Sequence, residues 1–194
     1  PAEFHAQTAV EAAIKLHESV ASKLDIIDKI VIRTQEPAIR IISKVGKLAN
    51  AADRDHCIQY MVAVGLIFGD LIAEYYEDDF HQENQLIDKL RDKMIIEEDN
   101  QFSMDYLDPE KRSIANAVQV FFNDGTCSDD IQIEYPIGHK KRREEGIPLL
   151  EEKFWNNLNT CFDKDKSKLI YDLCLDQEKL EKTKVNEFME LFVK

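Results

Sequence analysis

The fold is decided by one stretch, NAADRDHCIQYMVAVGLIFGD, residues 50–70. A run of four ionisable residues, Asp53 to His56, leads through Cys57–Tyr60 into Met61–Gly69, where every residue is apolar or glycine. A segment without polar side chains is stable only when it is buried. We therefore expect residues 53–76 to form a long buried helix with a charged N-terminal end.

Composition limits the class of protein. The 194 residues are enough for one large domain or for a domain with an appendage. The net charge of −13 argues against a nucleic-acid partner, because the phosphates would be repelled. No apolar run approaches the ~20 residues that a helix needs to cross a bilayer, so we expect no membrane segment.

The four cysteines suggest neither a metal site nor disulfides. None of them forms a C-x-x-C pair, which zinc and iron–sulfur sites usually need, so we expect no metal and no cofactor. In a chain of this length without a secretory signal, reduced thiols are the usual state. These features predict a cytoplasmic protein. The cysteines are Cys57, Cys127, Cys161 and Cys174.

The N-terminal part of the chain is predicted to form a helix and then a strand. Thr8-Ala9-Val10-Glu11 has the capping-box pattern, and apolar residues recur behind it at helical spacing, which predicts a helix over 9–24. Residues 25–34 are rich in β-branched side chains, which predicts a strand. Further along, we expect a polar helix over 83–93 and a short strand over 94–98.

The second half of the chain is predicted to form a hairpin and then helices. Residues 113–122 alternate loosely, Asp124-Gly125 is a strong turn signal, and residues 131–135 alternate strictly. The predicted class is therefore α+β, with a mixed domain over 1–140 that combines an antiparallel hairpin and a long buried helix. A helical tail follows over 141–194. Its helices are expected over 148–162, 165–175 and 178–192, with an unpartnered apolar face of Leu149, Leu150, Phe154, Trp155 and Leu158.

The charged start of the helix predicted over 53–76 has two interpretations. If the helix begins near Asp53, then Asp53, His56 and Tyr60 share one face near its N-terminus. That end favours anions, so a His and a Tyr there would suit proton transfer with a carboxylate-bearing substrate. In the alternative, Asp53 caps the helix, His56 is a surface residue and Tyr60 is a phenol at the core edge. Spacing alone favours the alternative.

The remaining histidines carry weaker signals. His5 is expected in a loop, and His17, on an apolar stripe, at the core edge with its polar atoms satisfied. His139 adjoins the basic run Lys140–Arg143, which could attract a polyanionic metabolite, although a solvated linker is the favoured interpretation. His81 is assigned no role. The chain has no glycine-rich phosphate loop, no G-x-S-x-G and no H-E-x-x-H motif.

Four long stretches carry a family resemblance: PAEFHAQTAVEAA, ANAADRDHCIQYMVAVGLIFGDL, DPEKRSIANAVQVFFNDGT and EYPIGHKKRREEGIPLLEEKF. Together they resemble the C-terminal part of the MmgE/PrpD enzyme family. The resemblance covers about residues 1–160 and is weakest from Cys161 onward. It implies a large helical domain that bears a smaller α+β lid, with the active site between them. Residues 1–140 would be the lid, residues 141–194 would return to a helical domain preceding Pro1, and the chain would be part of a longer homodimeric enzyme.

The resemblance also implies an activity and a set of site residues. The implied reaction is the dehydration of a tricarboxylate, 2-methylcitrate, to 2-methylaconitate in propionate catabolism. The implied catalytic residues are Tyr60, which follows Gln59 as in the decarboxylase relatives, His5 near the first proline, and His56. Arg54 is the candidate for binding a substrate carboxylate. Two alternatives remain: a cis-aconitate decarboxylase-like enzyme, or a stand-alone binding domain without catalysis.

Overall fold

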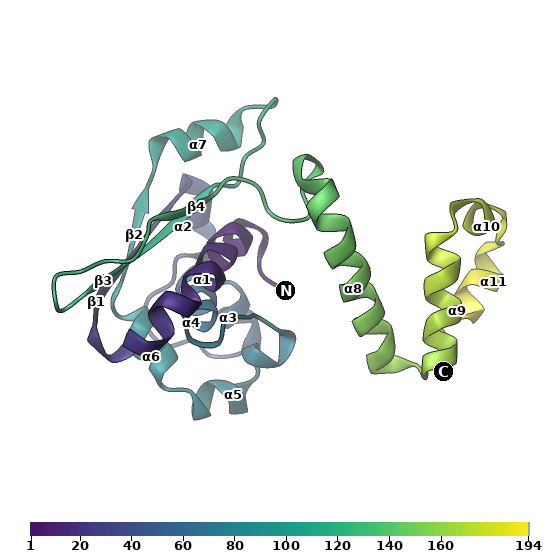
Figure 1. Cartoon of the computed structure of the whole chain (residues 1–194), viewed down its shortest axis with the longest axis horizontal. Coiled ribbons are helices and arrows are strands. Elements are labelled where there is room, and N and C mark those ends of the chain that lie inside the picture. Colours follow the sequence, from purple (N-terminus) through teal and green to yellow (C-terminus); the bar gives the residue numbers. More distant parts are fainter. Residues whose placement is uncertain (194) are drawn as a thin grey trace. The chain divides into compact units, whose positions relative to one another are not determined.

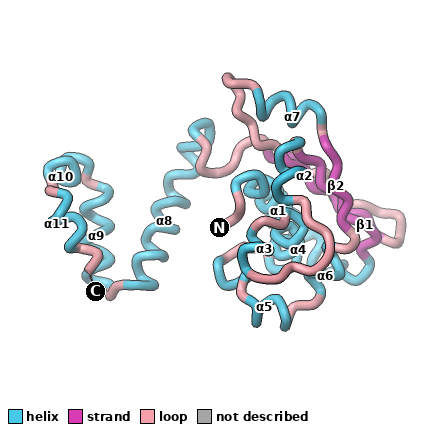
Figure 2. The backbone as a smooth tube through the Cα atoms, turned by 180° about the vertical axis from the view of Figure 1, so that it is seen from behind, coloured by secondary structure: helices cyan, strands magenta, loops and turns pink. Residues whose placement is uncertain are grey.

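The computed structural model describes residues 1–193, and the chain divides into two compact units, Pro1–Pro136 and Ile137–Lys194. In the described part of the chain, all four strands belong to the first unit and the second unit is built from helices (Figure 1, Figure 2). This combination of a small mixed sheet with helices confirms the predicted α+β class.

A mixed sheet in the order β2-β1-β3-β4 is the frame of the first unit. β1 and β2 are parallel, whereas the other two pairs are antiparallel. Ile30 lies opposite Val120 and Ile32 opposite Val118, and all four are buried, so one sheet face is apolar. The strands predicted over 25–34 and 94–98 and the hairpin are confirmed. The strands are β1 (Ile27–Thr34), β2 (Met94–Glu98), β3 (Asn116–Phe122) and β4 (Ile131–Ile133).

Helix α1, Gln7–Val20, contacts β3 and β4 of the sheet and also the buried helix α4, Ile58–Phe68. The two helices approach closely where small residues meet, because a Cβ added to Gly65 would lie 3.0 Å from the Cβ of Ala13. The predicted capping box is wrong: the Thr8 hydroxyl donates to the carbonyl of Ile114 at 2.6 Å instead of capping α1. Beyond α1 the chain continues as a 3-10 helix, Ala21–Ile26.

The helix expected over 53–76 is broken, so the prediction of one long helix is wrong. Helix α3, Ala51–Asp55, ends at His56, and Cys57 has an extended backbone before α4 begins. The cap of α3 is Asn50, whose side chain accepts from the Asp53 amide, rather than Asp53 itself. At the other end, α4 stops at Gly69 with a φ of 68°, and a 3-10 helix, η3 (Ala73–Tyr76), follows.

Two helices appear where none was expected. Helix α2, Glu36–Ile42, begins at Gln35, whose side chain accepts from the Ala38 amide, and Pro37 lies in its first turn, where a missing N–H costs nothing. Helix α7, Asn100–Leu107, is capped by Asp99. The polar helix expected over 83–93 is shorter in the structure, α6 (Leu86–Arg91), and a separate helix, α5 (Asp78–Glu83), ends where it was expected to begin.

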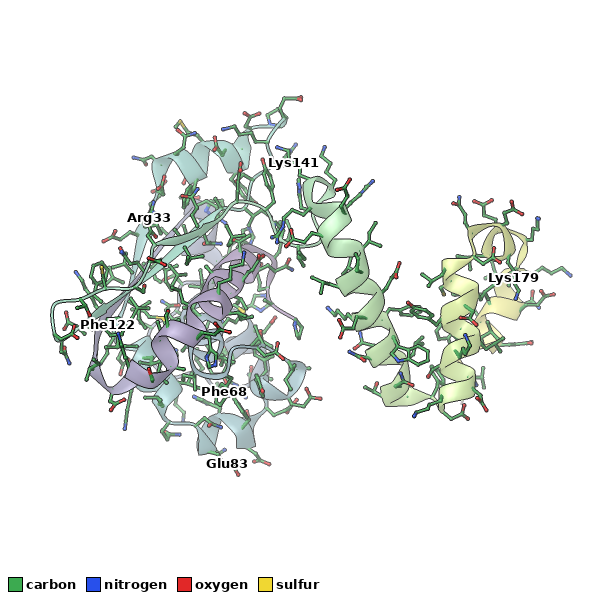
Figure 3. The ribbon with its side chains drawn as sticks, viewed as in Figure 1. Arg33, Phe68, Glu83, Phe122, Lys141 and Lys179 are labelled. Atoms are coloured by element: carbon green, nitrogen blue, oxygen red, sulfur yellow. The ribbon has the colours of Figure 1, made fainter. Side chains whose placement is uncertain are left out.

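The other face of the sheet carries a smaller core and an ion-pair cluster. Phe102 of α7 packs with Ala115 and Ala117. Arg33 of β1, labelled in Figure 3, binds both Asp99, at 2.8 Å, and Asp130, at 2.7 Å. These ion pairs connect the start of α7 to the chain before β4.

The second unit contains four α-helices and a short 3-10 helix, Lys140–Arg142, in its described part, and two aromatic residues of α8 pack against α9. Phe154 and Trp155 contact Tyr171, with ring centroids 5.9 Å and 5.4 Å apart, and Leu158 is buried. The expectation that these three residues lack a partner within the tail is therefore wrong, whereas Leu149 and Leu150 are exposed. Among residues 1–193, no helix has both the length and the apolarity needed to cross a membrane. The helices are α8 (Arg143–Cys161), α9 (Lys164–Leu175), α10 (Gln177–Lys182) and α11 (Val185–Glu190).

Candidate functional site

Both ring nitrogens of the His5 imidazole lie within hydrogen-bonding distance of another side chain. Its Nδ1 lies 2.8 Å from Glu3 Oε1, and its Nε2 lies 3.3 Å from the hydroxyl of Tyr106 on α7. When Glu3 is ionised, Nδ1 carries the ring hydrogen and Nε2 accepts the hydrogen of Tyr106. His5 is only 8% exposed and lies in a 3-10 helix, Phe4–Ala6, so the expectation of a plain loop histidine is wrong.

The backbone of His5 is fixed by a residue far along the chain. The buried side-chain amide of Asn116, at the start of β3, donates to the His5 carbonyl at 2.8 Å and to the Thr8 hydroxyl at 2.7 Å. The N–H of His5 donates to Glu3 Oε2 at 2.8 Å. The sheet and Glu3 together therefore set the position of this imidazole.

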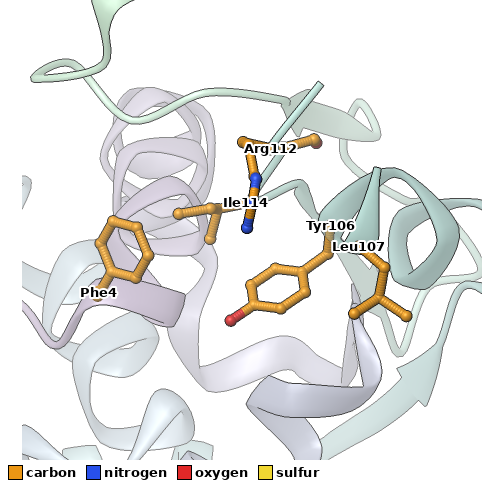
Figure 4. Close-up of a pocket in the computed structure, with 6 residues that line it drawn as sticks. Phe4, Tyr106, Leu107, Arg112 and Ile114 are labelled. Atoms are coloured by element: carbon orange, nitrogen blue, oxygen red, sulfur yellow. The ribbon is translucent and has the colours of Figure 1, made fainter. Parts of the chain in front are cut away.

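Beside His5 lies a cavity of about 250 Å³. Figure 4 shows Phe4 and Tyr106 on two sides of it, with the nitrogen-bearing end of Arg112 directed towards the space near Ile114 and Tyr106. The Tyr106 hydroxyl that contacts His5 thus belongs to a residue that lines the cavity. The lining residues are Phe4, Tyr106, Leu107, Arg112, Ser113 and Ile114.

Tyr60 lies in the buried interior of the first unit. Its side chain has no exposed surface, and its hydroxyl donates to the carbonyl of Tyr75 at 2.6 Å. Burial raises the pKa of the Tyr60 phenol to about 12, and the positive charge of Arg54 opposes the rise only in part. At neutral pH the phenol is therefore protonated.

Arg54 is buried in the same region, and its guanidinium is already bound. It donates to the carbonyl of Tyr76 at 2.6 Å, pairs with Asp78, and lies 3.4 Å from Nδ1 of His81. His81 in turn contacts Asp88 through Nε2 at 3.0 Å and lies edge-on to the Tyr60 ring. The histidine that was assigned no role thus connects Arg54 to a carboxylate of α6.

His56 does not join this cluster. It is the last residue of the turn that ends α3, its side chain is half exposed, and Nδ1 lies 3.2 Å from the carboxylate of Asp55. Asp53 binds Lys44 and the Ala49 amide, and these contacts lower the pKa of its carboxyl. The shared face expected for Asp53, His56 and Tyr60 does not exist, because the helix is broken between His56 and Ile58.

The structure places the predicted residues in three locations of one unit. Tyr60 and Arg54 share the buried cluster, His5 lies beside the cavity, and His56 lies at the α3–α4 junction. The N-terminal segment links the first two, because Tyr76 stacks near Tyr60 and its hydroxyl donates to the Pro1 carbonyl at 2.8 Å.

Sequence reasoning missed Glu3, Tyr106 and Arg112. Tyr106 contacts His5 across 101 positions, and no local spacing encodes such a contact. The pattern Glu-x-His, by contrast, was visible and could have suggested a carboxylate–imidazole pair. Within residues 1–193, no group of three or more His, Cys, Asp or Glu side chains is arranged to hold a metal ion.

Comparison with known proteins identifies the family. A family model described as the MmgE/PrpD C-terminal domain matches residues 1–177. The chain belongs to the MmgE/PrpD family. The resemblance read from the sequence is therefore confirmed, and it extends beyond residue 160.

Curated members of the MmgE/PrpD family match along the whole chain. A 2-methylcitrate dehydratase of Salmonella typhimurium is 52% identical over all of this chain and 40% of its own length. A 2-methylcitrate dehydratase of Cupriavidus necator is 53% identical over 99% of this chain and 40% of its own. A mitochondrial 2-methylcitrate dehydratase of Yarrowia lipolytica is 48% identical over all of this chain and 37% of its own. The chain thus spans about 40% of the length of these relatives.

Proposed function

We propose that the polypeptide carrying this chain removes water from 2-methylcitrate to give 2-methylaconitate. The observation that carries the proposal is the identity of 52% to the 2-methylcitrate dehydratases of Salmonella typhimurium and Escherichia coli over the full chain. The reaction needs a base for the carbon-bound proton, an acid for the leaving hydroxyl and cations for the carboxylates.

His5 is the base in this proposal. The Glu3 carboxylate holds the ring hydrogen on Nδ1 and favours the imidazolium that forms when Nε2 takes a proton from carbon. Because Nε2 meets the Tyr106 hydroxyl, the proton reaches His5 directly or through that hydroxyl. A base of this kind typically contributes about 10²- to 10⁴-fold in rate.

Tyr60 is the proposed acid, and its raised pKa keeps the proton available at neutral pH. The Tyr60 hydroxyl now donates to the Tyr75 carbonyl, so delivery of its proton requires η3 to move aside. The Arg54 guanidinium is bound by the Tyr76 carbonyl and by Asp78. A substrate carboxylate would bind Arg54 only by displacing the carboxylate of Asp78, whose side chain is 64% exposed. His56 would then orient substrate from the α3–α4 junction.

The full-length polypeptide tests the proposal. Incubation with 2-methylcitrate should give a conjugated alkene that absorbs in the ultraviolet, and His5→Gln should lower kcat by at least about 10²-fold. Release of carbon dioxide from cis-aconitate, with no reaction of 2-methylcitrate, would favour the decarboxylase instead. Binding of neither compound would favour a domain without catalysis.

We further propose that the chain works with an N-terminal helical domain of the same polypeptide, as a cytoplasmic homodimer. The relatives' greater length supports the extra domain. A single light-scattering mass equal to one full-length chain would contradict the homodimer.

A further inference from the structure

Arg112 is the unpaired arginine of the first unit. That unit has five arginines, and Arg112 makes no hydrogen bond or ion pair through its guanidinium to any residue from 1 to 193. In a chain with a net charge of −13, carboxylates are abundant, so a cation left without one is available to an anion from outside. The other four, Arg33, Arg40, Arg54 and Arg91, each bind a carboxylate.

The backbone of Arg112 is held in a conformation that arginine does not favour. Its φ is 48°, and it is the only residue other than glycine with a positive φ among those described. The turn is closed by the Arg112 amide, which donates to the Asp108 carbonyl at 2.8 Å. Glycine would adopt this φ without steric cost. Arginine occupies this position despite the steric cost of the left-handed conformation, which indicates a function for its side chain.

The cavity next to Arg112 combines this charge with apolar walls. Phe4, Leu107 and Ile114 supply the apolar surface, and the Tyr106 hydroxyl supplies a polar group that reaches His5 (Figure 4). Guanidinium groups bind carboxylates with charge-assisted hydrogen bonds. The occupant that fits both features is a small carboxylate with a short apolar substituent.

We propose that Arg112 binds one substrate carboxylate in the cavity of Phe4, Tyr106, Leu107 and Ile114, with the apolar wall receiving the substituent that distinguishes 2-methylcitrate from citrate. The choice of these two compounds rests on the proposed function; the assignment of Arg112 rests on the cavity, the missing partner and the backbone. The site would hold the substrate beside the imidazole of His5.

The test compares two adjacent cations in the full-length polypeptide. Arg112→Gln removes the proposed ligand group, whereas Lys111→Gln removes the same charge from a residue that pairs with Asp105 and does not line the cavity. Calorimetric titration with 2-methylcitrate should show a Kd about 10- to 100-fold higher for Arg112→Gln and near wild type for Lys111→Gln. In turnover, KM should rise while kcat changes little, because the contact exists before and during the reaction.

Arg112→Gly is the control that separates loss of binding from loss of folding. Because glycine suits the φ at this position, this variant should be at least as stable to heat as the wild type and yet bind as weakly as Arg112→Gln. Leu107→Ser should lower the preference for 2-methylcitrate over citrate, since Leu107 is 73% exposed and is not needed for the core.

The proposal is overturned if Arg112→Gln and Lys111→Gln weaken binding equally, or if kcat falls while Kd is unchanged. An unchanged preference for 2-methylcitrate in Leu107→Ser overturns the assignment of the apolar wall. If the wild type binds 2-methylcitrate without converting it, the dehydratase proposal fails and the comparison of the two cations still decides the role of Arg112. If the wild type does not bind 2-methylcitrate at all, both proposals fail.

Discussion

Tyr60 and His5 are held in opposite ways, and this difference determines how each could take part in catalysis. The Tyr60 phenol is fully buried, and its hydroxyl donates a hydrogen bond to the backbone carbonyl of Tyr75. The His5 ring is also buried, but one of its nitrogens meets a hydroxyl that lines a cavity. A ligand in the cavity would therefore lie one hydroxyl away from His5, whereas it would reach Tyr60 only after a movement of the chain.

Replacing Tyr60 by Phe tests its role at the level of the single residue. In the full-length enzyme, kcat should fall about 10²- to 10⁴-fold if the hydroxyl transfers a proton. The variant should also lose about 1–3 kcal/mol of stability, because the partly buried Tyr75 carbonyl loses its donor. Steady-state kinetics and denaturant unfolding measure the two effects separately.

Tyr106→Phe serves as the comparison for stability alone, since it removes a hydroxyl from a half-buried ring. If Tyr60→Phe loses stability but retains more than about a third of the wild-type kcat, far less than an acid–base loss, Tyr60 is only a core residue.

The raised pKa of Tyr60 predicts that the first unit loses stability in alkali. Unfolded tyrosine ionises near pH ~10, whereas the buried phenol holds its proton up to about 12. Above pH ~10 the unfolded state therefore binds fewer protons than the folded state, so the stabilisation is complete below that pH and is lost as pH rises through 12. The loss should approach about 2–3 kcal/mol.

Urea unfolding at several pH values from 9 to 12 measures this loss. Burial raises the pKa of Tyr76 as well, so part of the alkaline loss should remain in Tyr60→Phe. An equally steep alkaline loss in wild type and Tyr60→Phe would mean that Tyr60 does not contribute.

At the scale of elements, sequence patterns predict the strands and turns that depend on local periodicity. They miss the helix boundaries that depend on contacts between distant residues. The strands over 25–34 and 94–98 and the turn at Gly125 were predicted, because alternation and turn chemistry are local. The break at Cys57 was missed, because helical spacing in the sequence continues across it. Helix α2 was missed because Pro37 was taken as the end of a strand when it lies in the first helical turn.

The candidate site shows the same difference between features encoded locally and features set by long-range contacts. His5 and Tyr60 were named from a resemblance, but the partners that define their chemistry come from other elements: Tyr106 for His5, and Tyr75 for Tyr60. These contacts span 101 and 15 positions, and they depend on how α7 and η3 pack, which no motif records.

The end of helix α4 offers a stability prediction. Gly69 has a φ of 68°, and an added Cβ would lie 2.7 Å from the ring of His17, whose Nδ1 donates to the Leu66 carbonyl at 2.9 Å. Gly69→Ala should therefore cost the ~1–2 kcal/mol of a left-handed residue plus the cost of displacing His17. Gly125→Ala is the matched control, because its φ is 83° and its Cβ would meet no atom within 4 Å. Equal losses in thermal unfolding of the two variants would contradict the steric term.

At the scale of the whole molecule, the second unit leaves apolar side chains uncovered within itself. Leu149 and Leu150 of α8 are 51% and 46% exposed, and Leu169 and Leu175 of α9 are similarly exposed. Clusters of such residues commonly mark interfaces. This observation agrees with the proposal that these helices pack on a further domain of the same polypeptide.

We expect the 194-residue chain on its own to self-associate through this unit. The double variant Leu149→Ser/Leu150→Ser should shift the light-scattering mass towards the monomer. Val45→Ser is the control, because Val45 is 93% exposed but lies in the first unit. A monomeric wild-type chain at micromolar concentration would contradict the expectation.

The long-range hydrogen bonds of His5 and Thr8 also determine the order in which this part of the chain can fold. His5 bonds to residues 101 and 111 positions away, and Thr8 to one 106 positions away. Contacts of such high sequence separation close late in folding. During synthesis, Glu3 and His5 leave the ribosome before Asn116, and they acquire their fixed geometry only after Asn116 has emerged. A nascent chain stalled before that point would carry Glu3 and His5 without the strand that positions them, so the base of the proposed function could not act until β3 has been made.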